Sequence, residues 1–253
     1  MHDKQRFAGL RAAALTLACL AACGMANAQL VIGQTAGLSG SVAASVNETI
    51  AGAQLVIDSV NAQGGIHGEK IEVLRMDDAF DVKRAGENAK VLIEQKQVLA
   101  MFMTRGTPHT QAIIPLLDQN GVALVAPSTG AMALHQPLQK QVFNVRSTYQ
   151  REAQKAVEHL GTVGMNRIAV VHVTDSFGAD ALEGAKKGFA TAKIEPAVLV
   201  PADRDKPDYS AIVPKLVASN AQAVLWIGSG TAVVDGVKAL RATGSAAQVV
   251  TLS

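Results

Sequence analysis

Five short segments of this chain carry residues that suit the binding of a small anion. They span residues 38–41, 104–107, 127–130, 175–178 and 228–231, and four of the five place glycine beside serine or threonine. Hydroxyl groups and free backbone N–H groups are good partners for a carboxylate. Taken singly, each segment is better explained by a helix cap or a turn. All five together favour a ligand site.

Signatures of catalysis and of metal binding are weak. Gly228 and Gly230 begin like a dinucleotide fingerprint, but Val233 stands where the third glycine belongs, and no acidic residue occurs where a ribose partner should follow. The sequence has no Walker loop, no HExxH and no GxSxG motif, and its histidines form no i,i+4 pair. The pair Asp77 and Asp78 is expected to be solvated or to cap a helix. We therefore predict no catalytic residue, no metal and no cofactor.

The elements that must position these segments alternate regularly along the chain. Apolar, strand-like runs occupy residues 30–33, 71–74, 98–103, 122–126, 142–145, 168–173, 198–200, 224–227 and the chain from 249. Between most of them, apolar residues recur with helical spacing, and Ser45 and Glu48 have the spacing of a capping box. Such alternation predicts βαβ units, a parallel sheet and helices on both faces. Ligands of such sheets bind beyond the carboxyl ends of the strands, where the five segments lie.

The alternation falters between residues 139 and 150, which predicts a boundary between two similar α/β lobes. The last residues, 249–253, resemble a strand with neither turn nor helix after it. Because a sheet that stops there leaves an edge unpaired or a face uncovered, we expect the second lobe to be incomplete at its C-terminus.

The N-terminus has the pattern of an export signal. Lys4, Arg6 and Arg11 precede an apolar run, residues 12–22, and a small-x-small cleavage site, residues 26–28. We interpret residues 1–28 as a signal peptide. An alternative is a lipoprotein signal in residues 20–23, in which Cys23 would be lipidated. Both patterns predict export.

Composition narrows the class of partner. The formal net charge is +2, and the first 28 residues account for all of it, so the remainder is balanced and nucleic acid is not an expected partner. The only cysteines are Cys19 and Cys23, so the exported body can contain no disulfide. After the signal, no run of 18 apolar residues is long enough to span a bilayer.

Several motifs resemble a known family in order and spacing. They occupy residues 32–40, 61–68, 126–129, 143–146, 175–178 and 208–210. An exported α/β body with these motifs resembles the leucine/isoleucine/valine-binding proteins, which are type I periplasmic binding proteins of ABC importers. The resemblance implies two lobes, residues 29–146 and 147–253, that close on a ligand like a hinge.

The resemblance also implies a set of ligand-binding residues. The first lobe would hold the carboxylate of a small solute on Gly106, Thr107, Ser128 and Thr129, and we add Ser39 from the first of the five segments. The second lobe would close over the solute with Tyr149, Phe177 and Ser229. Amino acid binders of this family usually carry a tyrosine and an acidic residue where this chain has Gly230 and Ser253. A buried ammonium would then lack a counter-charge, so an aromatic or aliphatic acid remains open as the ligand.

The sequence as a whole predicts a periplasmic solute-binding protein rather than an enzyme. It would deliver a carboxylate-bearing solute to a membrane permease. A sensor or receptor domain is an alternative, as is an exported α/β enzyme, which would lose turnover on replacement of Asp77 or Asp78.

Overall fold

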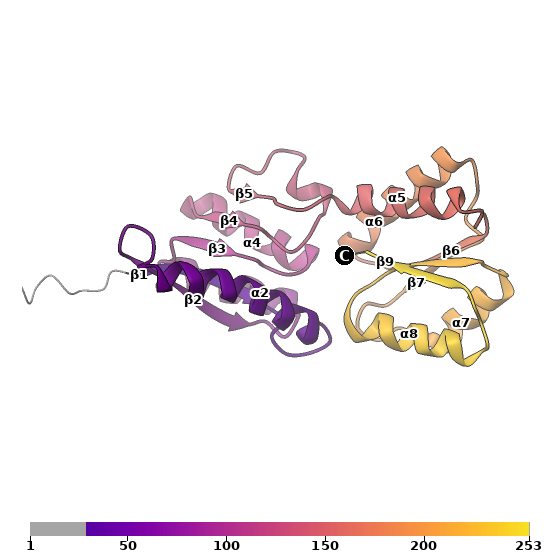
Figure 1. The fold of residues 1–253 in the computed structure, drawn as a ribbon, viewed down its shortest axis with the longest axis horizontal. Coiled ribbons are helices and arrows are strands. Elements are labelled where there is room, and N and C mark those ends of the chain that lie inside the picture. Colours follow the sequence, from indigo (N-terminus) through magenta and orange to yellow (C-terminus); the bar gives the residue numbers. More distant parts are fainter. Residues whose placement is uncertain (1–28, 253) are drawn as a thin grey trace, which may run out of the picture.

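The computed structural model describes residues 29–252, and the expected signal peptide, the Cys23 alternative and Ser253 lie outside them. The described chain forms two lobes side by side, each built on its own parallel sheet (Figure 1). The expected fold class, two α/β lobes with parallel sheets flanked by helices, is confirmed. Among these residues no helix combines the length and the apolar character that a bilayer crossing requires.

The first lobe contains a five-stranded sheet of order β2-β1-β3-β4-β5. Its strands are β1 (Gln29–Ala36), β2 (Lys70–Asp77), β3 (Ala100–Phe102), β4 (Ala123–Val125) and β5 (Val142–Phe143). Its helices are α2 (Ala43–Ala62), α3 (Val82–Lys90), the π-helical turn η2 (Val91–Gln95), α4 (Thr107–Asn120) and the 3₁₀ turn η3 (Met132–Leu134). Buried residues of η2 and α4 pack with the strand residues Met101 and Leu124, whereas the N-terminal part of α2 packs around Ala36 in a separate cluster.

The second lobe contains a four-stranded sheet of order β7-β6-β8-β9. Its strands are β6 (Ile168–Val173), β7 (Val198–Ala202), β8 (Ala223–Ile227) and β9 (Gln248–Thr251). Its helices are α5 (Tyr149–Thr162), α6 (Ser176–Ala192), α7 (Tyr209–Ala218) and α8 (Gly230–Ala242).

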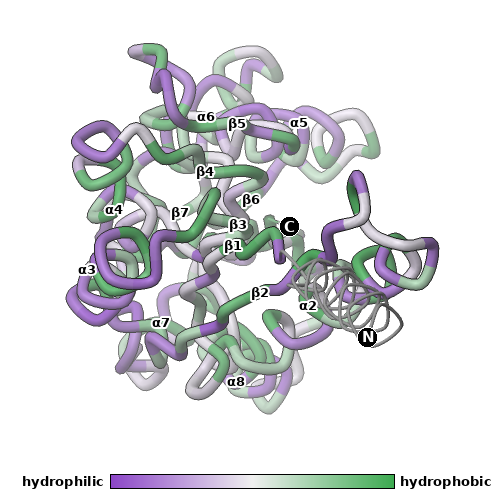
Figure 2. The backbone as a smooth tube through the Cα atoms, turned by 90° about the vertical axis from the view of Figure 1, so that its left-hand side faces the viewer, coloured by the Kyte–Doolittle hydropathy of each residue, from purple (hydrophilic) through white to green (hydrophobic). Residues whose placement is uncertain are grey.

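Successive side chains of β6 and β8 point to opposite faces of the second sheet, and helices cover both faces. Ile168 and Val170 pack with residues of α5 and α6, whereas Ala169 and Val171 pack with residues of α7 and α8. All residues of β8 are buried, as a central parallel strand requires. In the first lobe, Figure 2 shows a hydrophobic strand β4 and a largely hydrophilic helix α3, most of whose residues are exposed.

The capping box expected at Ser45 and Glu48 is wrong. Helix α2 begins two residues earlier, at Ala43, and its N-cap residue Val42 makes no side-chain cap. The Ser45 hydroxyl instead donates a hydrogen bond to the carbonyl of Val42, 3.1 Å away. Val42 is buried, so packing rather than a polar cap sets the start of this helix.

Candidate functional site

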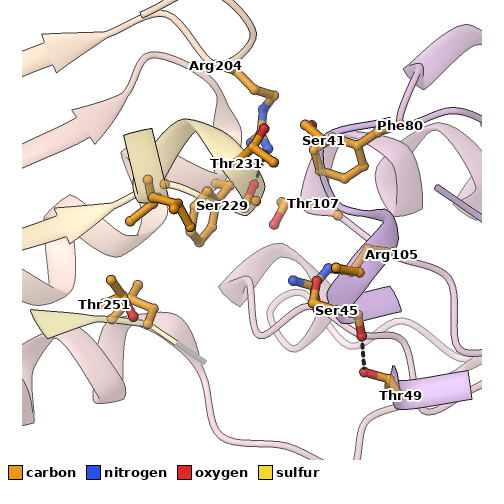
Figure 3. A pocket seen from close by; sticks show the side chains of 18 of the residues that line it. Ser41, Ser45, Thr49, Phe80, Arg105, Thr107, Arg204, Ser229, Thr231 and Thr251 are labelled. Carbon is orange, nitrogen blue, oxygen red and sulfur yellow. Dashed lines mark hydrogen bonds between the residues drawn. The ribbon is translucent and has the colours of Figure 1, made fainter. Parts of the chain in front are cut away.

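A cavity of about 650 Å³ lies between the two lobes, beyond the carboxyl ends of their strands. This volume lies in the range of ordinary small-molecule sites. Its lining combines two arginines, aromatic rings and several hydroxyl groups, most of which Figure 3 displays. The polar and charged lining residues are Ser41, Ser45, Glu48, Thr49, Arg105, Thr107, Arg204, Ser229, Thr231 and Thr251.

Arg105 brings a positive charge into the cavity from the first lobe. It follows strand β3 and is half-buried, and its Nη1 donates a hydrogen bond to the hydroxyl of Ser128 at 3.0 Å. Burial lowers the pKa of its guanidinium, and nearby Arg146 and Arg204 lower it further. An arginine nevertheless remains charged at neutral pH. Within residues 29–252, no carboxylate lies within ion-pair distance of Arg105.

Arg204 enters from the second lobe, after strand β7, and its charge is already compensated. Its guanidinium forms an ion pair with Asp175 and a longer hydrogen bond, 3.4 Å, to the hydroxyl of Ser229. The same group lies 5.2 Å from the ring centroid of Phe80, which belongs to the first lobe, and 5.7 Å from that of Phe177. Arg204 therefore shapes the wall of the cavity but differs from Arg105 in having its own counter-charge.

Aromatic rings supply much of the apolar surface of the cavity. Tyr149 and Phe177 meet edge to face with centroids 4.8 Å apart, and both line the cavity from the second lobe. Phe80 lines it from the first lobe and stacks on His109 at 4.4 Å. Burial lowers the pKa of His109, so the neutral ring is favoured behind Phe80.

The predicted site residues divide into three groups. Gly106, Thr107, Tyr149, Phe177 and Ser229 line the cavity. Ser128 and Thr129 lie behind the lining, where Ser128 accepts from Arg105 and the buried Thr129 hydroxyl bonds that of Thr107 at 2.7 Å.

Ser39 alone forms the third group, which does not line the cavity. It is exposed, and its hydroxyl donates to Asp77 at 2.5 Å, so the structure does not bring it to the cavity. A role in ligand binding stays a prediction for all eight residues.

Sequence reasoning missed Arg105, Arg204 and Phe80. A signal existed for Arg105, since it stands inside one of the five candidate segments, between a strand and a helix. Phe80 and Arg204 also follow strands, β2 and β7, but their segments lack the glycine and hydroxyl pattern. Only the packing of the lobes places these two residues together.

The acidic pair Asp77 and Asp78 holds the loops after β1 and β2. Burial alone would raise the pKa of Asp77, but hydrogen bonds from the Ser39 hydroxyl and from the amides of Ala79, Ser39 and Leu38 outweigh burial and lower it. Asp78 is buried, its pKa is raised by burial, and it accepts from the Thr35 hydroxyl and the Phe80 amide.

The expected helix cap is therefore elsewhere. Asp81 caps α3 by accepting from the amide of Arg84 at 2.8 Å. The expectation that Asp78 is solvated or caps a helix is wrong, because it makes its hydrogen bonds inside the first lobe.

Comparison with known proteins decides the family. Residues 29–253 match the sequence profile of a family described as periplasmic binding protein. The chain belongs to this family. The expected likeness to the leucine/isoleucine/valine-binding type is also confirmed, since the chain is 29% identical over 213 residues to a "Leu/Ile/Val-binding protein homolog 3" of Brucella melitensis.

Solved periplasmic binding proteins share the fold. A substrate-binding periplasmic protein from Ralstonia solanacearum superposes with a TM-score of 0.83 at 28% identity, covering 89% of this chain and 64% of that one. An extracellular ligand-binding receptor from Verminephrobacter eiseniae gives 0.79 at 27% identity, covering 89% and 64%. The Brucella relative is matched over 80% of this chain and 55% of its own length. The chain thus spans a little over half the length of such relatives, which are named as binding proteins rather than enzymes.

Proposed function

We propose that this chain is a periplasmic solute-binding protein that holds a small carboxylate-bearing solute between its lobes, residues 29–146 and 147–253. The observation that carries the proposal is Arg105, a half-buried cation in the cavity wall with no acidic partner among the described residues. A charge removed from water needs a partner, and an anionic solute would supply it.

Hydrogen-bond donors near Arg105 support a carboxylate as that anionic group. Thr107 lies at the first turn of α4, and Gly106 precedes it, so free backbone N–H groups and the positive end of the helix face the same region. Charge-assisted hydrogen bonds to a carboxylate are each worth about 1.5–3 kcal/mol.

The body of the solute would lie against the aromatic rings. Phe80, Tyr149 and Phe177 offer apolar surface on both lobes, which suits an aromatic or branched aliphatic group. We favour an acid without an ammonium group, because Glu48 is exposed and is the only carboxylate lining the cavity in the described part of the chain.

A branched-chain amino acid is the second candidate. The names of relatives such as the Brucella protein favour it. Glu48 would then have to serve as the counter-charge of the ammonium.

Export and delivery complete the proposal. Residues 1–28 would direct the chain to the periplasm, with or without a lipid on Cys23, and a membrane permease of an ABC importer would receive the solute. A sensor or receptor domain is an alternative, favoured by the Verminephrobacter relative. A permease and an ATPase encoded beside this gene would support transport, and a histidine kinase would support sensing.

A melting-temperature screen of the purified protein tests the binding function. Branched-chain amino acids and aromatic or aliphatic carboxylates would be added singly. A ligand at 100 times its dissociation constant adds about 2.7 kcal/mol of stability, which is readily detected. A shift with one class would support the proposal and identify the solute type. A cooperative melt that no carboxylate shifts would contradict it.

A further inference from the structure

The two lobes touch at one wall of the cavity through their backbones. The amide of Thr231, in the first turn of α8, donates a hydrogen bond to the carbonyl of Ser41 in the first lobe, 3.0 Å away. Ser41, Gly230 and Thr231, here called the clasp, all line the cavity, and Figure 3 displays Ser41 and Thr231 close together where the two lobes meet. Contact between the lobes therefore closes this side of the site.

Gly230 allows the clasp to form. It adopts a φ of +64°, and a Cβ built on it would lie 2.3 Å from the carbonyl oxygen of Ser41 and 2.8 Å from its carbonyl carbon. Both atoms belong to the backbone of the other lobe, so no side-chain rotation relieves the contact. Any side chain at this position would have to part the lobes at the clasp.

Other contacts cross between the lobes in the same arrangement. The Ser176 hydroxyl of α6 donates to Oε1 of Gln111 in α4 at 2.7 Å. Asp180 of α6 accepts from the amide of Met132 in the first lobe at 3.2 Å. Each of these bonds joins the two lobes, so its partners are expected to move apart when the clasp opens.

We propose that Gly230 is a positioning residue that permits the lobes to close over the cavity. A side chain at residue 230 prevents closure but leaves the packing within each lobe intact. A solute held between the lobes then binds tightly only when residue 230 has no side chain. The inference applies whichever solute binds.

Cross-linking of two introduced cysteines measures closure without any ligand. Gln111→Cys and Ser176→Cys place thiols at a pair of side chains that touch when the lobes are together, and residues 29–253 contain no other cysteine. The rate of cross-linking by a short bis-methanethiosulfonate is compared in three backgrounds: the otherwise unaltered chain, Gly230→Ala and Gly244→Ala.

Gly244 is the matched control because it adopts a φ of +80° with no atom within 4 Å of its added Cβ. Both alanine variants therefore suffer a similar backbone strain, of order 1 kcal/mol, and only Gly230→Ala meets the other lobe. We expect Gly230→Ala to slow cross-linking at least tenfold and Gly244→Ala to leave the rate within about twofold. Equal rates in Gly230→Ala and the unaltered background would overturn the proposal.

Thr231→Pro is a second variant if Gly230→Ala does not fold. Proline is tolerated in the first turn of a helix, and this change replaces the N–H that donates to the Ser41 carbonyl by a ring methylene, which would press against the same backbone oxygen. It should also slow cross-linking, and an unchanged rate in the folded variant would overturn the proposal. Melting of each ligand-free variant establishes that it is folded.

Discussion

The Nη1 atom of Arg105 lies 3.0 Å from the hydroxyl oxygen of Ser128, which accepts its hydrogen bond. This neutral partner, the only one that residues 29–252 provide for the Arg105 side chain, fixes the guanidinium but does not compensate its charge. Figure 3 shows the side chain extending from the first lobe into the cavity. A half-buried cation held in this way is unfavourable for the empty protein and favourable for binding an anion.

Replacement of Arg105 by glutamine should stabilise the ligand-free protein. Burial lowers the pKa of Arg105, so folding disfavours its charged form, and a neutral side chain removes that cost. We expect the free energy of unfolding to rise by up to about 1 kcal/mol, as measured by urea denaturation. Arg151→Gln, on the exposed surface of α5, is the control and should change little. A clear loss of stability in Arg105→Gln would mean that the structure has a partner for this charge.

The pH dependence of stability should change when Asp78 is replaced by asparagine. Burial raises the pKa of Asp78 above its ordinary value, with Asp77 acting in the same direction and His109 against it. The folded chain then binds this proton more tightly than the unfolded chain. Its contribution to stability is therefore lost as the pH rises from about 4 through the raised pKa.

The free energy of unfolding of Asp78→Asn should accordingly be close to that of the parent protein near pH 4. As the pH rises toward about 7, it should exceed the parent value by a growing margin. Urea denaturation of both proteins at several pH values measures the difference in the free energy of unfolding. A difference that stays constant over this range would rule out a raised pKa for Asp78.

Replacement by alanine should change the stability of the fold in opposite directions at two helical glycines. A Cβ on Gly236 in α8 would lie 2.3 Å from Cζ2 of the buried Trp226, whereas one on Gly52 in α2 meets no atom within 4 Å. Gly236→Ala should destabilise the fold by about 1–3 kcal/mol through overpacking. Gly52→Ala should stabilise it by about 0.5–1 kcal/mol through helix propensity. Thermal melting of both variants tests the packing of α8 on β8, and similar effects of the two changes would contradict it.

Glu48→Gln should leave the affinity for the solute within about twofold, because an exposed carboxylate contributes little. Titration calorimetry with the ligand from the melting screen measures this. A tenfold loss would instead identify Glu48 as the partner of an ammonium group and favour an amino acid ligand.

The sequence predicted the strands well because parallel strands are buried on both faces. The run from Val224 to Ile227 is almost uniformly apolar and became the fully buried β8. Caps were less predictable. The Ser45 and Glu48 spacing fitted a capping box, but burial of Val42 set the start of α2 two residues earlier.

The sequence predicted which loops form the site, but it did not predict that Arg105 and Arg204 bring positive charges into it. Thr107 and Ser229 reach the cavity because the carboxyl ends of parallel strands meet there. The contact of Arg204 with Phe80 joins two lobes, and no local pattern in the sequence encodes it. The same holds for Gly230, whose close neighbour Ser41 lies in the other lobe.

The central claim, that Arg105 binds the carboxylate of a solute, is tested most directly by a thermodynamic cycle. Calorimetry would compare the best-binding acid with its primary amide, on the parent protein and on Arg105→Gln. We predict that the parent prefers the acid by about 10- to 100-fold, the equivalent of a charge-assisted bond, and that Arg105→Gln removes most of this preference. An equal preference for the acid in both proteins would contradict the claim.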